Sequence, residues 1–452
     1  MLFRTPMLQN LSPRRRNPIA LSYRTVTAAE MSTNHVVSKS MQHRLANDPM
    51  LVLNKMASQN GSVNLGLGFP NFPPPNHITQ ALADAATGEN HMLHHYTRPY
   101  GHPRLVNILA RLYSNLLSIS LDPLDHILTT IGAFQGLSSI CQSLIHPGDE
   151  VILLEPFYSP YRNMLEMRGA VPVFVPLRPY DDGSGQSSAN WVFDKAELQN
   201  AVTNKTKAIF LNTPMNPLGK VFDREELLEI SDLCIKHNLL CVTDEVYEWL
   251  IYGRKQHIRI ASFPNMWERT VTLGSAGKSF SVTGWKVGWC IGPKHLIKVL
   301  QNYHFSSIRT SPTISQEAVA VALEKEMLVL NTPESYFYTL SKDMEGKRNR
   351  MCKYLDNAGF QAITPDGGYY IIADISSIQA RSVGNEEKTD EALDYRFAKW
   401  AVTEKKLCVL PMSIFYSENH RHLCEKYVRI CFVKTDETLE KAKEILDDWK
   451  QN

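Results

Sequence analysis

Short apolar runs alternate with helical patterns through the middle of this 452-residue chain, and no other feature of the sequence constrains its fold as strongly. The runs have the length of strands and are apolar at nearly every position; they cover residues 151–154, 172–176, 208–212, 240–244, 270–273 and 287–291. Amphipathic helical patterns lie among them, at residues 131–145, 158–168, 224–237 and 295–303. Strands that are apolar on both faces and alternate with helices indicate an α/β fold, with a mostly parallel sheet covered by helices on both sides.

The pattern changes after about residue 313. A long helical stretch, interrupted near Pro333, is followed by two strand-like runs and a last amphipathic helix, at residues 368–373, 427–433 and 438–449. We therefore expect a large domain over residues 76–312 and a smaller α+β domain over residues 313–452. Residues 31–75 are expected to form an N-terminal arm that contributes to the smaller domain.

The N-terminal segment differs in composition from the rest of the chain. Its first 29 residues contain five arginines, several Ser and Thr, and no Asp or Glu. This composition is typical of a mitochondrial transit peptide, so we expect residues 1–30 to direct the protein to the mitochondrial matrix. A basic leader without function is the alternative, and an internal start at Met31 would give a cytosolic form.

Charge and cysteine usage exclude several classes of function. The net charge of +2 gives no field strong enough to favour nucleic acid, and no apolar run approaches the length of a membrane span. The eight cysteines form no CxxC pair and no His/Cys cluster with zinc spacing. We expect free thiols in a reducing compartment, no structural disulfide and no bound metal.

One lysine, Lys278, lies in a run of small residues that follows an apolar strand. We expect residues 274–277 to form a tight turn that holds the lysine at the end of the strand, where open α/β sheets bind ligands. An amine in that position suits a Schiff base with an aldehyde cofactor, and Ser275 and Lys286 suit a phosphate. Taken alone, the motif is better explained by a surface lysine in a glycine-rich loop.

Other polar residues also follow predicted strands. Asn216 comes after the run that ends near residue 211, Asp244 ends the next run, and Tyr247 follows it. An Asn, an Asp, a Tyr and a Lys at the carboxyl ends of parallel strands can converge on one small aromatic ring. The Pro- and Gly-rich segment 64–75 lacks the third glycine of a dinucleotide fingerprint, which excludes a nucleotide-binding oxidoreductase.

Four motifs together resemble one family. They are NTPMNPLGK from residue 212, TDEVY from residue 243, GSAGKSFSVTGWKVGW from residue 274 and YVRICFVK from residue 427. From about residue 46 to 450 the chain resembles the fold-type I, pyridoxal-phosphate-dependent class I aminotransferases. Within them it is most similar to the kynurenine aminotransferase, glutamine transaminase K and cysteine-S-conjugate β-lyase group.

The resemblance implies pyridoxal 5′-phosphate as cofactor and a role for each polar residue. Lys278 would form the Schiff base and move a proton between the substrate's Cα and the cofactor. Asp244 would pair with the pyridine nitrogen and keep the ring an electron sink. Asn216 and Tyr247 would hydrogen-bond the phenolic oxygen, and the ring of Tyr158 would stack on the pyridine.

The resemblance also implies how the phosphate and the substrate are held. Ser275, Lys286 and the backbone N–H groups of Ala133 and Phe134 would bind the phosphate. Tyr96 would reach the phosphate from a neighbouring subunit, which implies a homodimer with shared active sites. The substrate would contact Gly68, Asn216 and Arg429, whose guanidinium would bind the α-carboxylate.

Each residue also has a structural explanation that needs no ligand: a helix N-cap for Asp244, a surface strand position for Arg429 and a core aromatic for Tyr158. Their common order and spacing favour the functional interpretation. The substrate pocket departs from the family pattern at Met50, Leu67, Phe134, Met215, Arg309 and Thr310. These departures change the expected shape and charge of the pocket.

The sequence therefore predicts an enzyme that transfers an amino group from an L-amino acid to a 2-oxo acid. Kynurenine, glutamine and other neutral, aromatic or sulfur-containing amino acids are the expected donors, and β-elimination from cysteine S-conjugates is an expected side reaction. Two alternatives stay open. Arg309 could pair with an acidic substrate and shift the specificity, or the chain could be a non-catalytic scaffold with the same fold.

Overall fold

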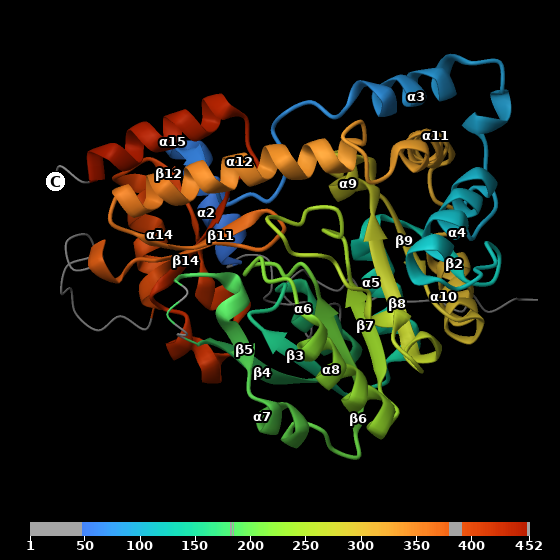
Figure 1. Ribbon diagram of the computed structural model, residues 1–452, viewed down its shortest axis with the longest axis horizontal. Helices are drawn as coiled ribbons and strands as arrows, with labels where there is room; N and C mark the ends of the chain where they lie inside the picture. The colour runs from blue at the N-terminus through green and yellow to red at the C-terminus, as the bar shows by residue number, and fades with distance from the viewer. Residues whose placement is uncertain (1–47, 181–182, 184, 379–390, 450–452) are drawn as a thin grey trace, which may run out of the picture. The chain divides into compact units, whose positions relative to one another are not determined.

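Eight strands form the main sheet of the computed structural model, which describes residues 48–180, 183, 185–378 and 391–449 (Figure 1). Their order is β2 (Ile127–Ile131), β9 (Val287–Ile291), β8 (Thr270–Ser275), β7 (Leu240–Asp244), β6 (Thr206–Asn212), β3 (Glu150–Glu155), β4 (Val171–Pro179) and β5 (Trp191–Phe193). Neighbours from β8 to β4 are parallel, whereas β9 is antiparallel to both its neighbours and β5 to β4. The predicted mostly parallel sheet is confirmed.

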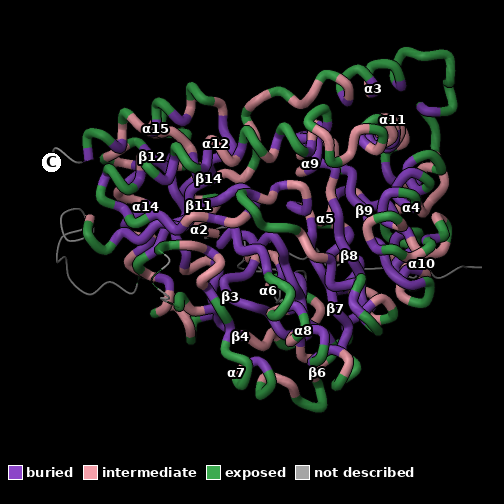
Figure 2. The backbone as a smooth tube through the Cα atoms, in the orientation of Figure 1, coloured by how far each residue is buried: buried purple, intermediate pink, exposed green. Residues whose placement is uncertain are grey.

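Helices cover both faces of this sheet. Alternate side chains of its strands point to opposite faces, so each face contributes apolar side chains that the helices bury. Val151 and Leu153 of β3 pack in one apolar cluster with α5 (Gly132–Leu144), α6 (Pro160–Arg168) and α10 (Lys294–Ser307). Ile152 and Leu154 pack in another, with α8 (Arg224–His237). Since both faces are buried, as the colouring of Figure 2 shows, the strands are apolar at successive positions.

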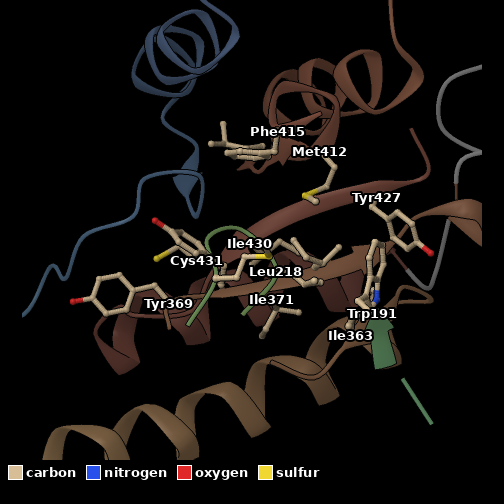
Figure 3. Packing of buried hydrophobic residues seen from close by; sticks show 14 of the residues in the cluster. Trp191, Leu218, Ile363, Tyr369, Ile371, Met412, Phe415, Tyr427, Ile430 and Cys431 are labelled. Carbon is tan, nitrogen blue, oxygen red and sulfur yellow. The ribbon is translucent and has the colours of Figure 1, made fainter. Parts of the chain in front are cut away.

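A second sheet lies in the C-terminal part of the chain. Its order is β10 (Gln361–Ile363), β11 (Tyr370–Asp374), β14 (Tyr427–Cys431) and β13 (Leu410–Pro411), with every pair antiparallel. Side chains of β11 and β14, among them Ile371 and Ile430, fill the core around it (Figure 3). The N-terminal strand β1 (Val63–Asn64) pairs with β12 (Leu407–Cys408), which brings the segment after β1 beside β14.

The other helices pack around these sheets. They are α2 (Pro49–Asn60), α3 (Asn76–Thr87), α4 (Pro103–Leu117), α7 (Lys195–Asn200), α9 (Ala276–Ser279), α11 (Thr313–Val329), α12 (Tyr336–Asn357), α14 (Leu393–Thr403) and α15 (Asp436–Trp449). Figure 1 shows α12 and α15 side by side, and they pack on each other. Within the described residues, no helix is long and apolar enough to cross a membrane.

One local prediction was wrong. We expected a tight turn at residues 274–277, but Gly274 and Ser275 continue β8 because they still pair with β9, and the one-turn helix α9 follows. The described residues belong to one compact unit, residues 47–452, and the division into a larger and a smaller domain stays a prediction. The predicted transit peptide, residues 1–30, lies outside the described residues.

Candidate active site

A cavity of about 460 Å³ lies at the carboxyl ends of the parallel strands. Every predicted site residue except Tyr96 lines it: Gly68, Ala133, Phe134, Tyr158, Asn216, Asp244, Tyr247, Ser275, Lys278, Lys286 and Arg429. The topology explains this convergence. Strands β6, β7 and β8 end at the cavity, and β9 starts there because it runs in the opposite direction. Lys286, directly before β9, is thereby brought to the same edge as Lys278.

Lys278 lies in α9 with its amine inside the cavity. Its Nζ donates a hydrogen bond to the backbone oxygen of Gly68 at 3.0 Å. The amine also lies 4.7 Å from the ring centroid of Tyr369 and 5.4 Å from that of Tyr247. Burial lowers the pKa of Lys278 to about 8, so an appreciable fraction of the amine is neutral near physiological pH. The structure thus excludes a surface lysine.

Asp244 ends β7 as a carboxylate that is only 9 % exposed. Its Oδ2 accepts a hydrogen bond from the Tyr161 hydroxyl at 2.6 Å, and its Oδ1 accepts one from the backbone N–H of Val246 at 3.3 Å. Burial raises the pKa of Asp244, and the Tyr161 hydrogen bond opposes that rise. The residues after it form turns and no helix, so Asp244 is not a helix N-cap.

Arg429 reaches the cavity from β14 of the second sheet and is 3 % exposed, which excludes a surface position. Its Nη1 donates to Oδ1 of Asn216 at 3.0 Å and its Nη2 donates to the backbone oxygen of Gly66 at 2.9 Å. The guanidinium carbon lies 4.0 Å from the ring centroid of Tyr370 and 4.8 Å from that of Phe415. In the described part of the chain its buried Nε finds no hydrogen-bond partner, which leaves a donor for a ligand.

The first turn of α5 forms the end of the cavity that suits an anion. No side chain caps this helix, and the residues that carry its first amide groups, Gly132, Ala133 and Phe134, line the cavity. Gly132 has a φ of +72°, and a Cβ built there would lie 3.3 Å from Nζ of Lys286. A cation, the uncapped helix N-terminus and the nearby Ser275 together make an anion site.

Two tyrosines at the site were not predicted. Tyr161 holds Asp244, as described above, and Tyr370 lines the cavity and lies against Arg429. Both are far in sequence from their partners, so no local motif points to them. The predicted Tyr158 is half-buried, borders the cavity and packs edge-on against Tyr161 with 5.4 Å between ring centroids.

Tyr96 lies elsewhere and is 88 % exposed. It borders a separate surface hollow that also contains Thr310. The neighbouring Arg309 is exposed and stacks on Phe305, with its guanidinium carbon 4.9 Å from the ring centroid. Neither Arg309 nor Thr310 lines the cavity of its own chain.

The departures from the family pattern do not all reshape the cavity. Met50 and Phe134 line it, but Met215 does not. Met215 is 2 % exposed and packs in the hydrophobic core. Its backbone N–H donates to the backbone oxygen of Lys220, and the next residue, Asn216, lines the cavity. The expectation that Met215 alters the pocket directly was therefore wrong.

Comparisons with known proteins agree on one family. The sequence model of the class I and II aminotransferases matches residues 60–446. Kynurenine–oxoglutarate transaminase 3 of Mus musculus is 46% identical over 424 residues, which cover 94% of this chain and 92% of that protein. Kynurenine–oxoglutarate transaminase 1 of Homo sapiens is 45% identical over 405 residues, 89% of this chain and 96% of that protein.

Solved structures resemble the fold over the same range. Bna3p of Saccharomyces cerevisiae superposes with a TM-score of 0.85 at 30% identity, covering 92% of this chain and 99% of that chain. A single mutant of Thermus thermophilus aspartate aminotransferase superposes with a TM-score of 0.78 at 27% identity, covering 91% and 99%.

Proposed function

Because this chain belongs to the class I and II aminotransferases, we propose that it transfers the amino group of kynurenine, glutamine or another neutral amino acid to a 2-oxo acid, with pyridoxal 5′-phosphate as cofactor. The family and the close relatives make the chain an aminotransferase. The donor, the acceptor and the cofactor are the parts proposed. The convergence of Lys278, Asp244 and Arg429 on one cavity carries the proposal, because these three groups serve different steps of a single reaction.

The residues around the cavity fit this cofactor. The uncapped amides of α5, with Lys286 and Ser275, suit its phosphate. The buried carboxylate of Asp244 suits its pyridine nitrogen, and the amine of Lys278 suits its aldehyde. When bound, pyridoxal phosphate supplies an aldehyde and an electron-accepting ring.

Asp244 would keep a negative charge beside the ring nitrogen. Because the carboxylate is little exposed, water screens its charge only weakly, and its interaction with a cationic nitrogen is stronger than in solution. The hydroxyl of Tyr161 and the amide of Val246 fix both carboxylate oxygens and favour the charged form.

Asn216 is oriented by the protein before any ligand binds. Its Oδ1 accepts from Arg429, so its Nδ2 is the group left to donate into the cavity. Arg429 in turn has its position fixed by Asn216, Gly66 and two aromatic rings. The unpartnered Nε–H of this guanidinium would receive the α-carboxylate of the amino acid, which satisfies a buried donor that otherwise costs stability.

Lys278 would act as the proton carrier of the reaction. Its lowered pKa leaves part of the amine neutral near physiological pH, so the amine would take a proton from the α carbon of the amino acid and give it to the cofactor. The hydrogen bond to Gly68 and the rings of Tyr247 and Tyr369 hold the amine in place.

We further propose a homodimer with shared active sites. Tyr96 is almost fully exposed and does not line the cavity of its own chain, which supports a role at the site of a second copy. Chains carrying Lys278→Ala and chains carrying Tyr96→Ala should each be impaired, whereas mixed dimers should regain activity. Each mixed dimer would contain one site with neither substitution. Mixtures no more active than the sum of their parts would contradict sharing.

Mitochondrial import and a β-lyase side reaction complete the proposal. The arginine-rich, acid-free composition of residues 1–30 supports import, which a fusion of these residues to a fluorescent protein would test. Release of pyruvate and ammonium from a cysteine S-conjugate, compared with formation of the corresponding oxo acid, would measure β-elimination against transamination.

The experiment that tests the main proposal is an absorbance scan of the purified protein with added pyridoxal phosphate. A visible-edge band should form, shift on addition of one amino donor and return with one 2-oxo acid, and this would identify the pair. A band that ignores kynurenine, glutamine, methionine and phenylalanine but responds to acidic amino acids would favour shifted specificity. In that case the kcat/KM values of Arg309→Ala for acidic and neutral donors would test the role of Arg309. Absence of any band would refute the proposal.

A further inference from the structure

Two buried glutamates, Glu245 and Glu248, lie in the turn that follows β7. They alternate in sequence with Asp244 and Tyr247, which line the cavity, whereas neither glutamate does. Backbone hydrogen bonds from Glu248 to Glu245 and from Leu250 to Tyr247 close the turn. A buried carboxylate is costly unless it is paired and hydrogen-bonded, and the reaction proposed above uses neither of these two.

Arg259 bridges the two carboxylates and is itself 9 % exposed. Its Nη2 donates a hydrogen bond to Oε2 of Glu248, and its Nε lies 3.7 Å from Oε2 of Glu245 as an ion pair. The guanidinium therefore meets two carboxylates with two different nitrogens, which its planar shape allows. Its carbon lies 5.8 Å from the ring centroid of Trp249 and 5.9 Å from that of Tyr113, and these rings also hold it in place.

Glu248 is tied to the body of the protein by two aromatic side chains. The hydroxyl of Tyr113 on α4 donates to its Oε1 at 2.5 Å, and the indole N–H of Trp289 on β9 donates to that hydroxyl at 3.0 Å. A Cβ built on Gly274 would lie 2.0 Å from the indole nitrogen, so the glycine on β8 leaves room for this bond.

Glu245 is held in the same way from two other elements. Its Oε1 accepts a hydrogen bond from the hydroxyl of Thr243 on β7 at 3.1 Å, and its Oε2 shares one with Nε2 of His257 at 2.8 Å. All four oxygens of the two glutamates thus have a partner. The turn after β7 is fixed from outside the cavity to α4, to β7 and β9, and to the segment that carries His257 and Arg259.

Tyr247 depends on this turn more than Asp244 does. Asp244 still belongs to β7, where it pairs with Leu273 of β8, and its carboxylate is held by Tyr161. Tyr247 follows the strand and lies between the two glutamates in sequence, so the turn sets the position of its backbone. A hydrogen bond weakens steeply when its length or angle departs from the ideal, and a small shift of the turn would therefore weaken any bond that Tyr247 donates.

We infer that Arg259 is a positioning residue, which bridges Glu245 and Glu248 and thereby fixes the turn that presents Tyr247 to an oxygen of the bound cofactor. The inference rests on the proposed function, because it needs pyridoxal phosphate with its phenolic oxygen beside Tyr247. It extends that proposal to a residue that does not line the cavity.

The test is Arg259→Lys in the protein loaded with pyridoxal phosphate. Lysine keeps the charge but has a single nitrogen, so it can pair with one carboxylate and releases the other. A weaker donor at Tyr247 leaves the cofactor oxygen more basic, and a proton beside it is then retained to higher pH. The midpoint of the absorbance titration should rise by about 0.4 to 1 pH unit, the equivalent of one ordinary hydrogen bond.

A double-mutant cycle separates positioning from a general loss of stability. In a Tyr247→Phe background, Arg259→Lys should cause no further shift of the midpoint, because the group that it positions is gone. Arg348→Lys is the matched control, since Arg348 is 8 % exposed and its guanidinium carbon lies 5.0 Å from the ring centroid of Tyr252. Arg348 does not line the cavity, so its substitution should lower thermal stability and leave the midpoint unchanged.

Glu248→Gln tests the same network should Arg259→Lys fail to fold. The amide has one acceptor oxygen in place of two, so it loses either Tyr113 or Arg259 as a donor, and the midpoint should again rise. An unchanged midpoint in the folded variants, or an equal shift with and without Tyr247, would overturn the inference. If the wild-type protein forms no chromophore with pyridoxal phosphate, the proposed function fails and the inference with it, so the two failures are distinguishable.

Discussion

Replacing Arg429 by Lys is the perturbation whose effect the structure defines most closely. The guanidinium contributes one hydrogen bond to Asn216 and one to Gly66, and its buried Nε has no partner within the described residues. Lysine keeps the positive charge but has a single nitrogen on a flexible stem. It cannot hold Asn216 and Gly66 and at the same time replace the Nε–H that is left to bind a carboxylate.

The expected magnitude follows from the bonds that are lost. A hydrogen bond between charged groups contributes about 1.5–3 kcal/mol. Since 1.4 kcal/mol corresponds to a factor of ten, loss of one such bond should weaken binding of the amino acid carboxylate by about 10- to 150-fold. The same loss should appear in kcat/KM for every donor, because every amino acid carries the α-carboxylate.

The assay is calorimetric titration of the variant with an unreactive carboxylate analogue, together with steady-state kinetics. Arg348→Lys is a matched control, because Arg348 is also buried, bonds to a backbone oxygen and an Asn side chain, and lies 5.0 Å from a tyrosine ring centroid. Arg348 is not in the cavity lining. The control should lose stability without losing carboxylate affinity. Equal affinity loss in both variants, or less than a twofold loss in Arg429→Lys, would refute the reasoning.

Three further outcomes are expected. In the cofactor-free protein, burial lowers the pKa of Lys278 to about 8. Labelling of Lys278 by an amine-selective reagent, followed by mass spectrometry, should therefore rise between about pH 7 and 9 and then level off. A rise that continues beyond about pH 10 would contradict this. Tyr161→Phe removes a hydrogen bond that lowers the pKa of Asp244. The acidic limb of the pH–kcat/KM profile should therefore move to higher pH. A limb that stays in place would count against a charged Asp244. Gly68→Ala places a methyl group 1.8 Å from the Tyr370 oxygen, and calorimetric unfolding should show a loss of about 1–3 kcal/mol; an unchanged stability would mean that the segment moves freely.

Part of the site could be predicted because parallel strands place their ends at one edge. Asp244 ends β7, Asn216 follows β6 and Lys278 follows β8, so a pattern of apolar runs with polar ends was enough to bring them together. The helix boundaries were equally accessible where the apolar period is clear, as in α8, whose Asp223 and Glu226 form a capping box. These features depend only on local sequence.

The antiparallel strand β9 could not be predicted in the same way. A strand buried on both faces has the same apolar composition in either direction, so its sequence does not report its orientation. The turn expected at residues 274–277 was wrong for a related reason, since the partner of Gly274 and Ser275 lies on β9 and decides whether they continue the strand. Glycine and serine taken alone favour a turn.

The tyrosine contacts depend on tertiary packing alone. Tyr161 and Asp244 are 83 residues apart, and the ring of Tyr247, after β7, lies edge to face with the ring of Tyr370 on β11, with 6.5 Å between centroids. Tyr161 lies in α6 with its buried side toward the main sheet, where any apolar ring of similar size would also pack. Only the position of a carboxylate at the end of β7 shows that the hydroxyl is needed.

Arg429 shows why the substrate site needs both sheets. The arginine lies on β14, and its two hydrogen-bond acceptors come from the segment after β1 and from the loop after β6. Its partner Asn216 lies 213 positions away, and their bond fixes the amide of Asn216 as well as the guanidinium. The group that would bind the substrate carboxylate and a group that would bind the cofactor therefore orient each other. Displacing either sheet relative to the other would disturb both, so we expect substitutions at Arg429 to lower cofactor affinity as well as carboxylate affinity. Equilibrium dialysis of pyridoxal phosphate with Arg429→Lys would show it, and cofactor affinity equal to that of the wild type would mean that the two groups are oriented independently.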